Sequence, residues 1–347
     1  MHSTISSDTD DDAGKRAGSV SSFGPSQHVR LETGFLDAKL AENLRGAFDL
    51  VFARKNAREL NPKRFVWDNW FVENQYHMQR TPASEFFSED LYAELENALL
   101  EYGQRRLGCS SMTPVWLSYY THGMKQELHA DVPHGPFAFV LSLTLNEHRK
   151  SHFTGGETVI LKPRVLDYWR SFEAHEVIEE TSILTRIEPE FNRLVVFDPR
   201  FPHGVSQVEG TRDPSKGRLV LHGWFAEPSP FFEGEAFSNT DAAADALNLV
   251  LEDLFATLQE MPRLMGVLCL RLTIAANDGR VQHVEILADT LIPHPSDFES
   301  DPAEVRDEAL NIIFNCLAEA KFAVDKADSE IQDNEECAFV TIPLVFE

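Results

Sequence analysis

The sequence lacks any long apolar run, and this absence limits where the protein can act. No stretch reaches the roughly 18 apolar residues that a membrane-spanning helix needs. Residues 1–28 also lack an apolar signal core, and the acidic run from Asp10 to Asp12 disfavours an Arg-rich transit peptide. We therefore expect a disordered acidic and Ser-rich tail over residues 1–28, no membrane contact and a cytoplasmic protein.

Cysteine is scarce, which excludes several chemistries. The chain of 347 residues has 4 cysteines, and no two of them form a CxxC pair. A disulfide framework or a thiolate zinc site would require closer spacing or an oxidising compartment. We expect free, buried thiols.

Basic residues are outnumbered, with 31 Lys and Arg against 56 Asp and Glu and a net charge of -25. Such a chain is poorly suited to nucleic acid, where contacts between cations and phosphates dominate affinity. The imbalance is concentrated in residues 229–347, which carry 24 acidic and 6 basic residues. The acidic part is either a solvated surface or a site for a basic protein partner.

The apolar spacing predicts helices first and then a run of strands. Helical spacing covers residues 35–55 and 88–106, with Ser88 as the expected N-cap of the second helix. Short β-branched or aromatic runs separated by turn residues follow at 114–120, 137–145, 157–161, 193–197 and 218–224. This order predicts an α+β domain with a barrel or sandwich core that could hold a ligand at one mouth.

Two further segments divide the chain. The insertion at 163–189, which contains Trp169, is either a lid over a site or a docked surface helix. A Pro-rich break at 227–234 precedes a helical pattern and then strand, strand, helix and strand. We expect a first domain at 29–232, a helical linker at 233–262 and a small α+β domain at 263–347.

The stretch ELHADVPHGP holds the residues that carry chemistry. On an extended strand, His129 and Asp131 would leave the same face and could grip one metal ion. His203 follows the apolar strand RLVVF and is the expected third ligand. Two His and one carboxylate on one face of an octahedron are typical of non-haem Fe(II) oxygenases, which keep three positions open.

A carboxylate-bearing co-substrate would need a cation beside this metal. Arg218 lies 15 residues after His203 at the start of the strand RLVLHGW, and its guanidinium could bind a carboxylate with two hydrogen bonds. Tyr120 ends the strand VWLSYY and could donate its hydroxyl to the same carboxylate; otherwise it is a core tyrosine.

Several neighbouring residues receive weaker predictions. His134 is expected to lie in a surface turn, and Trp116 and Trp224 in the core. His222 alternates with Arg218 along the strand, so His222 and Trp169 are candidates for contact with substrate. A further expectation is a buried ion pair between Asp198 and Arg200 that shapes the loop before His203.

The motifs YYTHGMKQELHAD, FTGGETVI, RLVVFDPRFPHGV and GRLVLHGWF resemble the Fe(II)/2-oxoglutarate-dependent oxygenases, and most of all their prolyl 4-hydroxylase-like branch. The resemblance covers about residues 110–230. It implies a double-stranded β-helix (jelly roll), with His129, Asp131 and His203 on Fe(II), and Arg218 and Tyr120 on 2-oxoglutarate. O2 is the second co-substrate, and ascorbate is a candidate additional cofactor. The chain departs from many members at Val220, where they have a hydroxyl residue.

The resemblance implies a hydroxylase that releases succinate and CO2, with peptidyl proline as the first candidate substrate. The alternatives are a free amino acid or another small molecule as substrate, or a non-catalytic binding or scaffold protein on an oxygenase fold. The segments LCLRLTIAANDGRVQHVEILADTLI and AFVTIPLVFE resemble the TonB-type C-terminal domain, which implies a protein partner for the acidic end of the chain.

Overall fold

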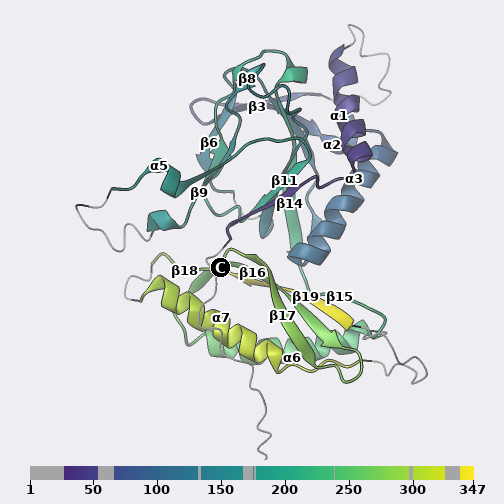
Figure 1. Ribbon diagram of the computed structural model, residues 1–347, viewed down its shortest axis with the longest axis vertical. Coiled ribbons are helices and arrows are strands. Elements are labelled where there is room, and N and C mark those ends of the chain that lie inside the picture. Colours follow the sequence, from purple (N-terminus) through teal and green to yellow (C-terminus); the bar gives the residue numbers. More distant parts are fainter. Residues whose placement is uncertain are drawn as a thin grey trace, which may run out of the picture.

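The computed structural model describes residues 27–53, 66–131, 134–166, 175, 177–237, 239–296, 300–324 and 337–347. They form a curled sheet with helices along one side, shown at the top of Figure 1, and a smaller sheet with two helices below it. We call the upper part the barrel, and we call β15 to β19 with α6 and α7 the C-terminal module. Among the described residues no helix is long and apolar enough to cross a membrane.

The barrel is a single antiparallel sheet that curls into a double-stranded β-helix, as the sequence predicts. Its strands follow the order β1-β11-β7-β14-β5-β3-β6-β12-β9-β10, while β2 pairs with β3 and β4 with β14. The bounds are β1 Val29–Thr33, β2 Asp68–Val72, β3 Tyr76–Pro82, β4 Cys109–Met112, β5 Trp116–Tyr120, β6 Lys125–His129, β7 Phe137–Ser142, β9 Thr158–Leu161, β10 Leu184–Ile187, β11 Arg193–Phe197, β12 His203–Val205 and β14 Arg218–Pro228. A separate ribbon joins β8 (Phe153–Thr154) to β13 (Glu209–Gly210).

Helices cover the side of the barrel on which β5, β7 and β14 bury their apolar side chains. These helices are α1 (Ala38–Ala53), α2 (Ala83–Phe86) and α3 (Glu89–Tyr102), and α3 continues into a π-helical turn, η2 (Gly103–Leu107). Leu44 and Phe48 of α1 are fully buried in one cluster with Leu117, Leu141 and Leu219 of the strands. Ser88 occupies the predicted N-cap of α3, but its side chain makes no capping hydrogen bond.

The insertion after β9 contributes one more strand to the sheet. Its end forms the short helix α5 (Glu180–Ile183) and then β10, which pairs with β9. Trp169, the candidate lid residue, lies outside the described residues, as does most of the predicted tail. A short 3-10 helix, η3 (Pro214–Lys216), leads into β14.

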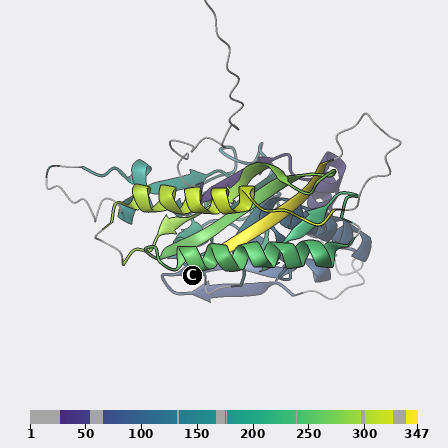
Figure 2. The ribbon, with the colours of Figure 1, turned by 90° about the horizontal axis from the view of Figure 1, so that it is seen from below.

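The C-terminal module contains the predicted strand, strand, helix and strand as β16, β17, α7 and β19, with one short strand that was not predicted, β18, before the helix. After β15 (Phe231–Glu233) and α6 (Thr240–Leu258) come β16 (Leu264–Ala275), β17 (Val281–Asp289), β18 (Ile292–Pro293), α7 (Pro302–Ala318) and β19 (Cys337–Phe346). Figure 2 shows α6 and α7 side by side across the outer face of this sheet. Leu268, Leu270 and Leu272 of β16 are fully buried in the cluster that these helices share with the sheet.

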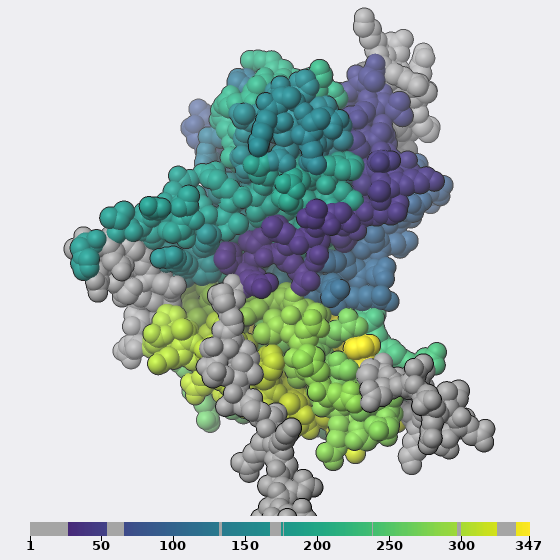
Figure 3. Space-filling model, viewed as in Figure 1, coloured from purple at the N-terminus to yellow at the C-terminus, as the bar shows by residue number. Residues whose placement is uncertain are grey.

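The inner face of the same sheet packs on the barrel, so β16 is buried on both faces. Val267 of β16 is fully buried in the main cluster of the barrel, and Ala288 and Val345 pack against that cluster. Residue Gln27 bridges to Asp289, and Arg30 donates to the carbonyl of Leu287. The segment that contains β1 thus runs along the boundary between the two parts (Figure 3). The domain limits expected from the sequence stay a prediction.

Candidate active site

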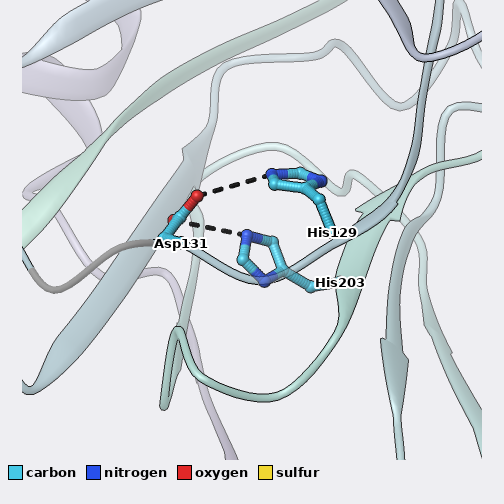
Figure 4. A group of neighbouring side chains, drawn as sticks. All are labelled: His129, Asp131 and His203. Carbon is cyan, nitrogen blue, oxygen red and sulfur yellow. Dashed lines mark ion pairs between the residues drawn. The ribbon is translucent and has the colours of Figure 1, made fainter.

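The structure brings His129, Asp131 and His203 together at one end of the barrel (Figure 4). The Nε2 atom of His129 lies 3.5 Å from Oδ1 of Asp131, and Nε2 of His203 lies 3.4 Å from Oδ2. One nitrogen or oxygen atom from each residue lies within 4.8 Å of the other two, so the group could hold a metal ion.

The three side chains converge because of strand pairing and a backbone hydrogen bond, and not because of alternation along one strand. His129 is the last residue of β6, and His203, the first residue of β12, lies opposite it in the sheet. Asp131 follows β6 and is held by its own backbone N–H, which donates to the carbonyl of Pro199 at 3.0 Å. The expectation that both HxD residues lie on one strand is therefore wrong, although the two side chains do converge.

Hydrogen bonds behind the imidazoles orient both rings. Nδ1 of His129 lies 2.9 Å from the carbonyl oxygen of Glu127, and Nδ1 of His203 lies 3.0 Å from that of Phe201. A carbonyl can only accept, so each Nδ1 carries the proton and donates it. In the neutral ring the lone pair is then on Nε2, which faces Asp131 and is the atom that a metal would take, whereas a second proton on Nε2 would instead donate to Asp131.

Charge favours an ionised carboxylate between the two rings. Burial opposes ionisation of Asp131, but hydrogen bonds and charge from His129 and His203 outweigh it and hold the pKa of this carboxyl well below its usual range. Burial likewise opposes protonation of His129, and its contacts with Asp131 and the Glu127 carbonyl outweigh that effect and raise its pKa. Protons would therefore compete with a divalent cation for Nε2 of His129 and the carboxylate of Asp131.

Trp224 supports the carboxylate, a role that the sequence did not indicate. Its indole Nε1 donates to Oδ2 of Asp131 at 2.9 Å, and its ring lies 4.6 Å from that of His134. We expected a core residue because Trp224 lies on an apolar strand, but the strand is buried on only one face here. The exposed His134 remains a turn residue, and it also lines the pocket.

The triad lines a cavity of about 310 Å³ that extends into the barrel. This volume is at the lower end of the range typical of small-molecule sites, about 300–1,000 Å³. The residues predicted to act together all face it. Its wall includes His129, Asp131, His203, Tyr120, Arg218 and His222.

Arg218 is buried in this cavity without a counter-ion. It is 1% exposed, and no carboxylate in the described part of the chain forms an ion pair with it, although the charge of Glu157 acts on it from further away. One Nη2 hydrogen bond reaches the hydroxyl of Thr158 at 3.2 Å, while Nε has no partner. Burial lowers the pKa of Arg218, against the opposing effect of Tyr120 and Glu157. Thr158 thus offers a hydroxyl beside Arg218, whereas Val220 on the strand of Arg218 has none.

Tyr120 lies against this guanidinium, whose carbon is 4.7 Å from the centre of the tyrosine ring. Its hydroxyl is 2.9 Å from the Met78 sulfur and 3.3 Å from Oε1 of Gln126. Both atoms are acceptors, so the hydroxyl proton has a partner before any ligand binds. The predicted contact with a co-substrate carboxylate stays a prediction.

His222 faces the cavity, as its alternation with Arg218 predicts. Its Nε2 lies 2.8 Å from the buried hydroxyl of Ser118. Burial lowers the pKa of His222 to about 3, and the charges of Arg218 and Arg80 add to this effect. The imidazole is therefore neutral and can hydrogen-bond without bringing a charge.

Sequence reasoning also missed one wall of the cavity, which we call the outer wall and which Trp70, Tyr76 and Arg80 line. Arg80 lies between two indoles, with its guanidinium carbon 3.3 Å from the Trp70 ring centre and 4.1 Å from that of Trp116. Trp116 is therefore partly exposed beside a cation and is not the core residue that we expected. The signal for this wall was weak, because β2 and β3 alternate no clear apolar face.

Comparison with known families agrees with this geometry. Residues 115–226 match the model of the 2OG-Fe(II) oxygenase superfamily, and this range contains the triad, Arg218 and Trp224. This part of the chain is thus an oxygenase domain, and the enzyme class is that of the 2-oxoglutarate-dependent dioxygenases. Such enzymes use Fe(II), 2-oxoglutarate and O2. No curated protein matches the chain.

Two solved structures align with more than half of this chain at low identity. A Pseudomonas putida prolyl-4-hydroxylase is 22% identical with a TM-score of 0.38, over 58% of this chain and 92% of that one. A Trichoplax adhaerens prolyl hydroxylase, solved with a hypoxia inducible factor peptide, is 15% identical with a TM-score of 0.40, over 57% and 83%. The family match ends at residue 226, before the segments that resemble the TonB-type domain.

Proposed function

We propose that His129, Asp131 and His203 bind Fe(II), and that Arg218 binds the far carboxylate of 2-oxoglutarate. The donor set fits this metal, because two imidazole Nε2 atoms and one carboxylate converge while their Nδ1 protons are occupied elsewhere. The observation that carries the proposal is Arg218, which is buried in the same cavity as the triad and has no ion-pair partner among the described residues. A buried guanidinium without a counter-ion is costly unless a ligand supplies the negative charge.

When bound, Fe(II) with 2-oxoglutarate and O2 supplies the hydroxylation of a C–H bond, with release of succinate and CO2. The chain contributes position and protection. Arg218 and the Thr158 hydroxyl orient the dicarboxylate, and Tyr120 closes the cavity beside it. Trp224 holds one carboxylate oxygen of Asp131. Because Asp131 fills the carboxylate position, which related halogenases leave to halide, hydroxylation is favoured over halogenation.

We further propose a peptidyl substrate, with proline as the first candidate. The likeness of the motifs to the prolyl 4-hydroxylase-like branch supports this choice. So does the outer wall, where Trp70 and Tyr76 stack with ring centres 5.9 Å apart and line the cavity. The acidic C-terminal module, with its resemblance to the TonB-type domain, is proposed to recruit the protein substrate in the cytoplasm.

The test begins with purified protein, Fe(II) and 2-oxoglutarate under anaerobic conditions. We expect a weak visible charge-transfer band that His129→Ala removes. Adding O2 and a peptide library should then give succinate, with product peptides heavier by one oxygen atom. If the band appears and free amino acids are oxidised while peptides are not, the proposed peptidyl substrate is wrong, but the proposed Fe(II) and 2-oxoglutarate site stands. Absence of both the band and succinate would support a scaffold protein instead.

A further inference from the structure

The loop between β11 and β12 touches the proposed metal centre on one side. Its carbonyl at Pro199 accepts from the backbone N–H of Asp131 at 3.0 Å, and its carbonyl at Phe201 accepts from Nδ1 of His203 at 3.0 Å. This loop, residues 198–202, therefore sets the position of one proposed ligand and the ring orientation of another.

The opposite side of the same loop is fixed to the C-terminal module. The carboxylate of Asp198, 1% exposed, accepts from Arg200 Nη2 at 2.6 Å and from the Thr290 hydroxyl at 3.1 Å. Arg200 Nη1 donates to the carbonyl of Phe346, at the end of β19, at 2.7 Å. The predicted ion pair between Asp198 and Arg200 is thus present, and it is bonded at both ends to the module.

Apolar packing joins the two parts at the same place. Phe201 of the loop is buried in a cluster with Ile160 and Phe197 of the barrel, and Ile292 of β18 belongs to that cluster too. Thr290 itself is rigid, because its backbone N–H donates to the Val267 carbonyl and its hydroxyl accepts from the Val267 N–H, both at 2.8 Å. The C-terminus lies at this junction in Figure 1.

We propose that the C-terminal module is a positioning element of the metal centre: Thr290 and the Phe346 carbonyl, through Asp198 and Arg200, hold the loop that orients Asp131 and His203. This inference rests on the proposed function. Partners behind the ligands of a metal site usually change its affinity about 10- to 100-fold when removed. The present contacts are one bond further away, so we expect a smaller change.

The experiment measures binding of Co(II) alone to the full chain, by its visible absorption. Thr290→Val keeps the shape of the side chain and removes the hydroxyl, and we expect it to weaken Co(II) binding at least about threefold and to shift the absorption band. Thr341→Val is the matched control, because Thr341 is fully buried in the same module and its hydroxyl has no hydrogen-bond partner among the described residues. We expect this control to bind Co(II) like the wild type.

A second variant, Arg200→Lys, keeps the positive charge beside Asp198 but cannot reach both Asp198 and Phe346. It should weaken Co(II) binding in the same direction as Thr290→Val. If both variants lose thermal stability while folded protein binds Co(II) with wild-type affinity and spectrum, the contacts are merely structural and the inference is wrong. If wild type and His129→Ala bind Co(II) equally, the metal centre itself is wrong, and the inference falls with it.

Discussion

The proposed role of Arg218 in binding 2-oxoglutarate would come at the expense of stability. Its guanidinium is buried beside Tyr120 and Thr158, and its Nε has no partner. In the ligand-free protein such a charge is destabilising, whereas a carboxylate in the cavity would satisfy it. Residues of active sites commonly carry this conflict between stability and function.

The replacement Arg218→Met should therefore separate the two effects. We expect the ligand-free variant to melt at or above the wild-type temperature, because an unpaired buried charge is gone. Its KM for 2-oxoglutarate should rise roughly 10- to 100-fold, since hydrogen bonds to charged groups contribute about 1.5–3 kcal/mol each. Succinate assays and thermal melts with and without 2-oxoglutarate measure both.

Arg280→Met is the control for that experiment, because the side chain of Arg280 is 74% exposed and remote from the cavity. Arg280→Met should change neither the melting temperature nor the KM for 2-oxoglutarate. A variant at Arg218 that keeps the wild-type KM would show that the co-substrate binds elsewhere, for instance at Arg80.

The lowered pKa of His222 predicts that the free energy of unfolding depends on pH. Its pKa is lowered from 6.5 to about 3, first by burial and then by Arg218 and Arg80. Between these values the unfolded chain takes up a proton that the folded chain does not. The free energy of unfolding should therefore fall as the pH falls from about 6.5 toward 3, by up to roughly 1.4 kcal/mol per pH unit from this group.

His222→Gln keeps a polar side chain beside Ser118 and cannot titrate. Denaturant titrations of the metal-free protein at several pH values should show a shallower loss of stability for the variant below pH 6.5. Equal slopes for variant and wild type would mean that His222 is protonated in the folded protein and that the cavity carries a further positive charge.

At the scale of elements, the register between β6 and β12 positions the two histidines, and Gly204 makes that register possible. His203 lies opposite His129 in the sheet, and the pairing shifts between His203 and Val205. A Cβ atom on Gly204 would lie 2.4 Å from the carbonyl oxygen of Gln126. No real side chain fits there, so only glycine lets the strands approach so closely.

Gly204→Ala should consequently force β12 away from β6. We expect a loss of roughly 2–4 kcal/mol in the free energy of unfolding, together with weaker metal binding. Gly46→Ala is the matched control, because a Cβ on Gly46 of α1 meets nothing within 4 Å. In a helix this change should stabilise by roughly 0.5–1 kcal/mol. Similar effects at both positions would contradict the steric argument.

The sequence predicts elements well where one face is consistently apolar. The strand Arg193–Phe197 was predicted with its observed bounds. By contrast, β2 and β3 carry mixed side chains, among them Trp70 on β2 and Arg80 on β3, and no period reveals these strands. Trp224 was assigned to the core because hydropathy cannot tell a buried face from a cavity wall. These errors concentrate around the site, where polar function overrides the apolar pattern.

At the scale of the whole molecule, the barrel and the C-terminal module share their apolar cores. Val267 of β16 is buried in the main cluster of the barrel, and Ile292 of β18 joins the cluster behind the loop of Phe201. Gly108 lies so close to Pro343 of β19 that an added Cβ would be 2.6 Å from the proline ring. Such packing resembles one interior rather than two touching surfaces, so the parts should unfold together.

All five tryptophans precede residue 225, so tryptophan fluorescence reports on the barrel alone. Leu310 of α7 is fully buried in the core of the C-terminal module, and Leu310→Ala should remove about 2–5 kcal/mol of stability there. If the parts unfold together, the fluorescence transition in denaturant will move to lower concentration and coincide with that seen by circular dichroism. Leu249→Ala, at a position of α6 that is 66% exposed, should leave the midpoint of the fluorescence transition unchanged. A fluorescence midpoint that stays in place for Leu310→Ala while the circular dichroism trace splits into two steps would instead show two independent folding units, with the barrel holding its metal centre unaided.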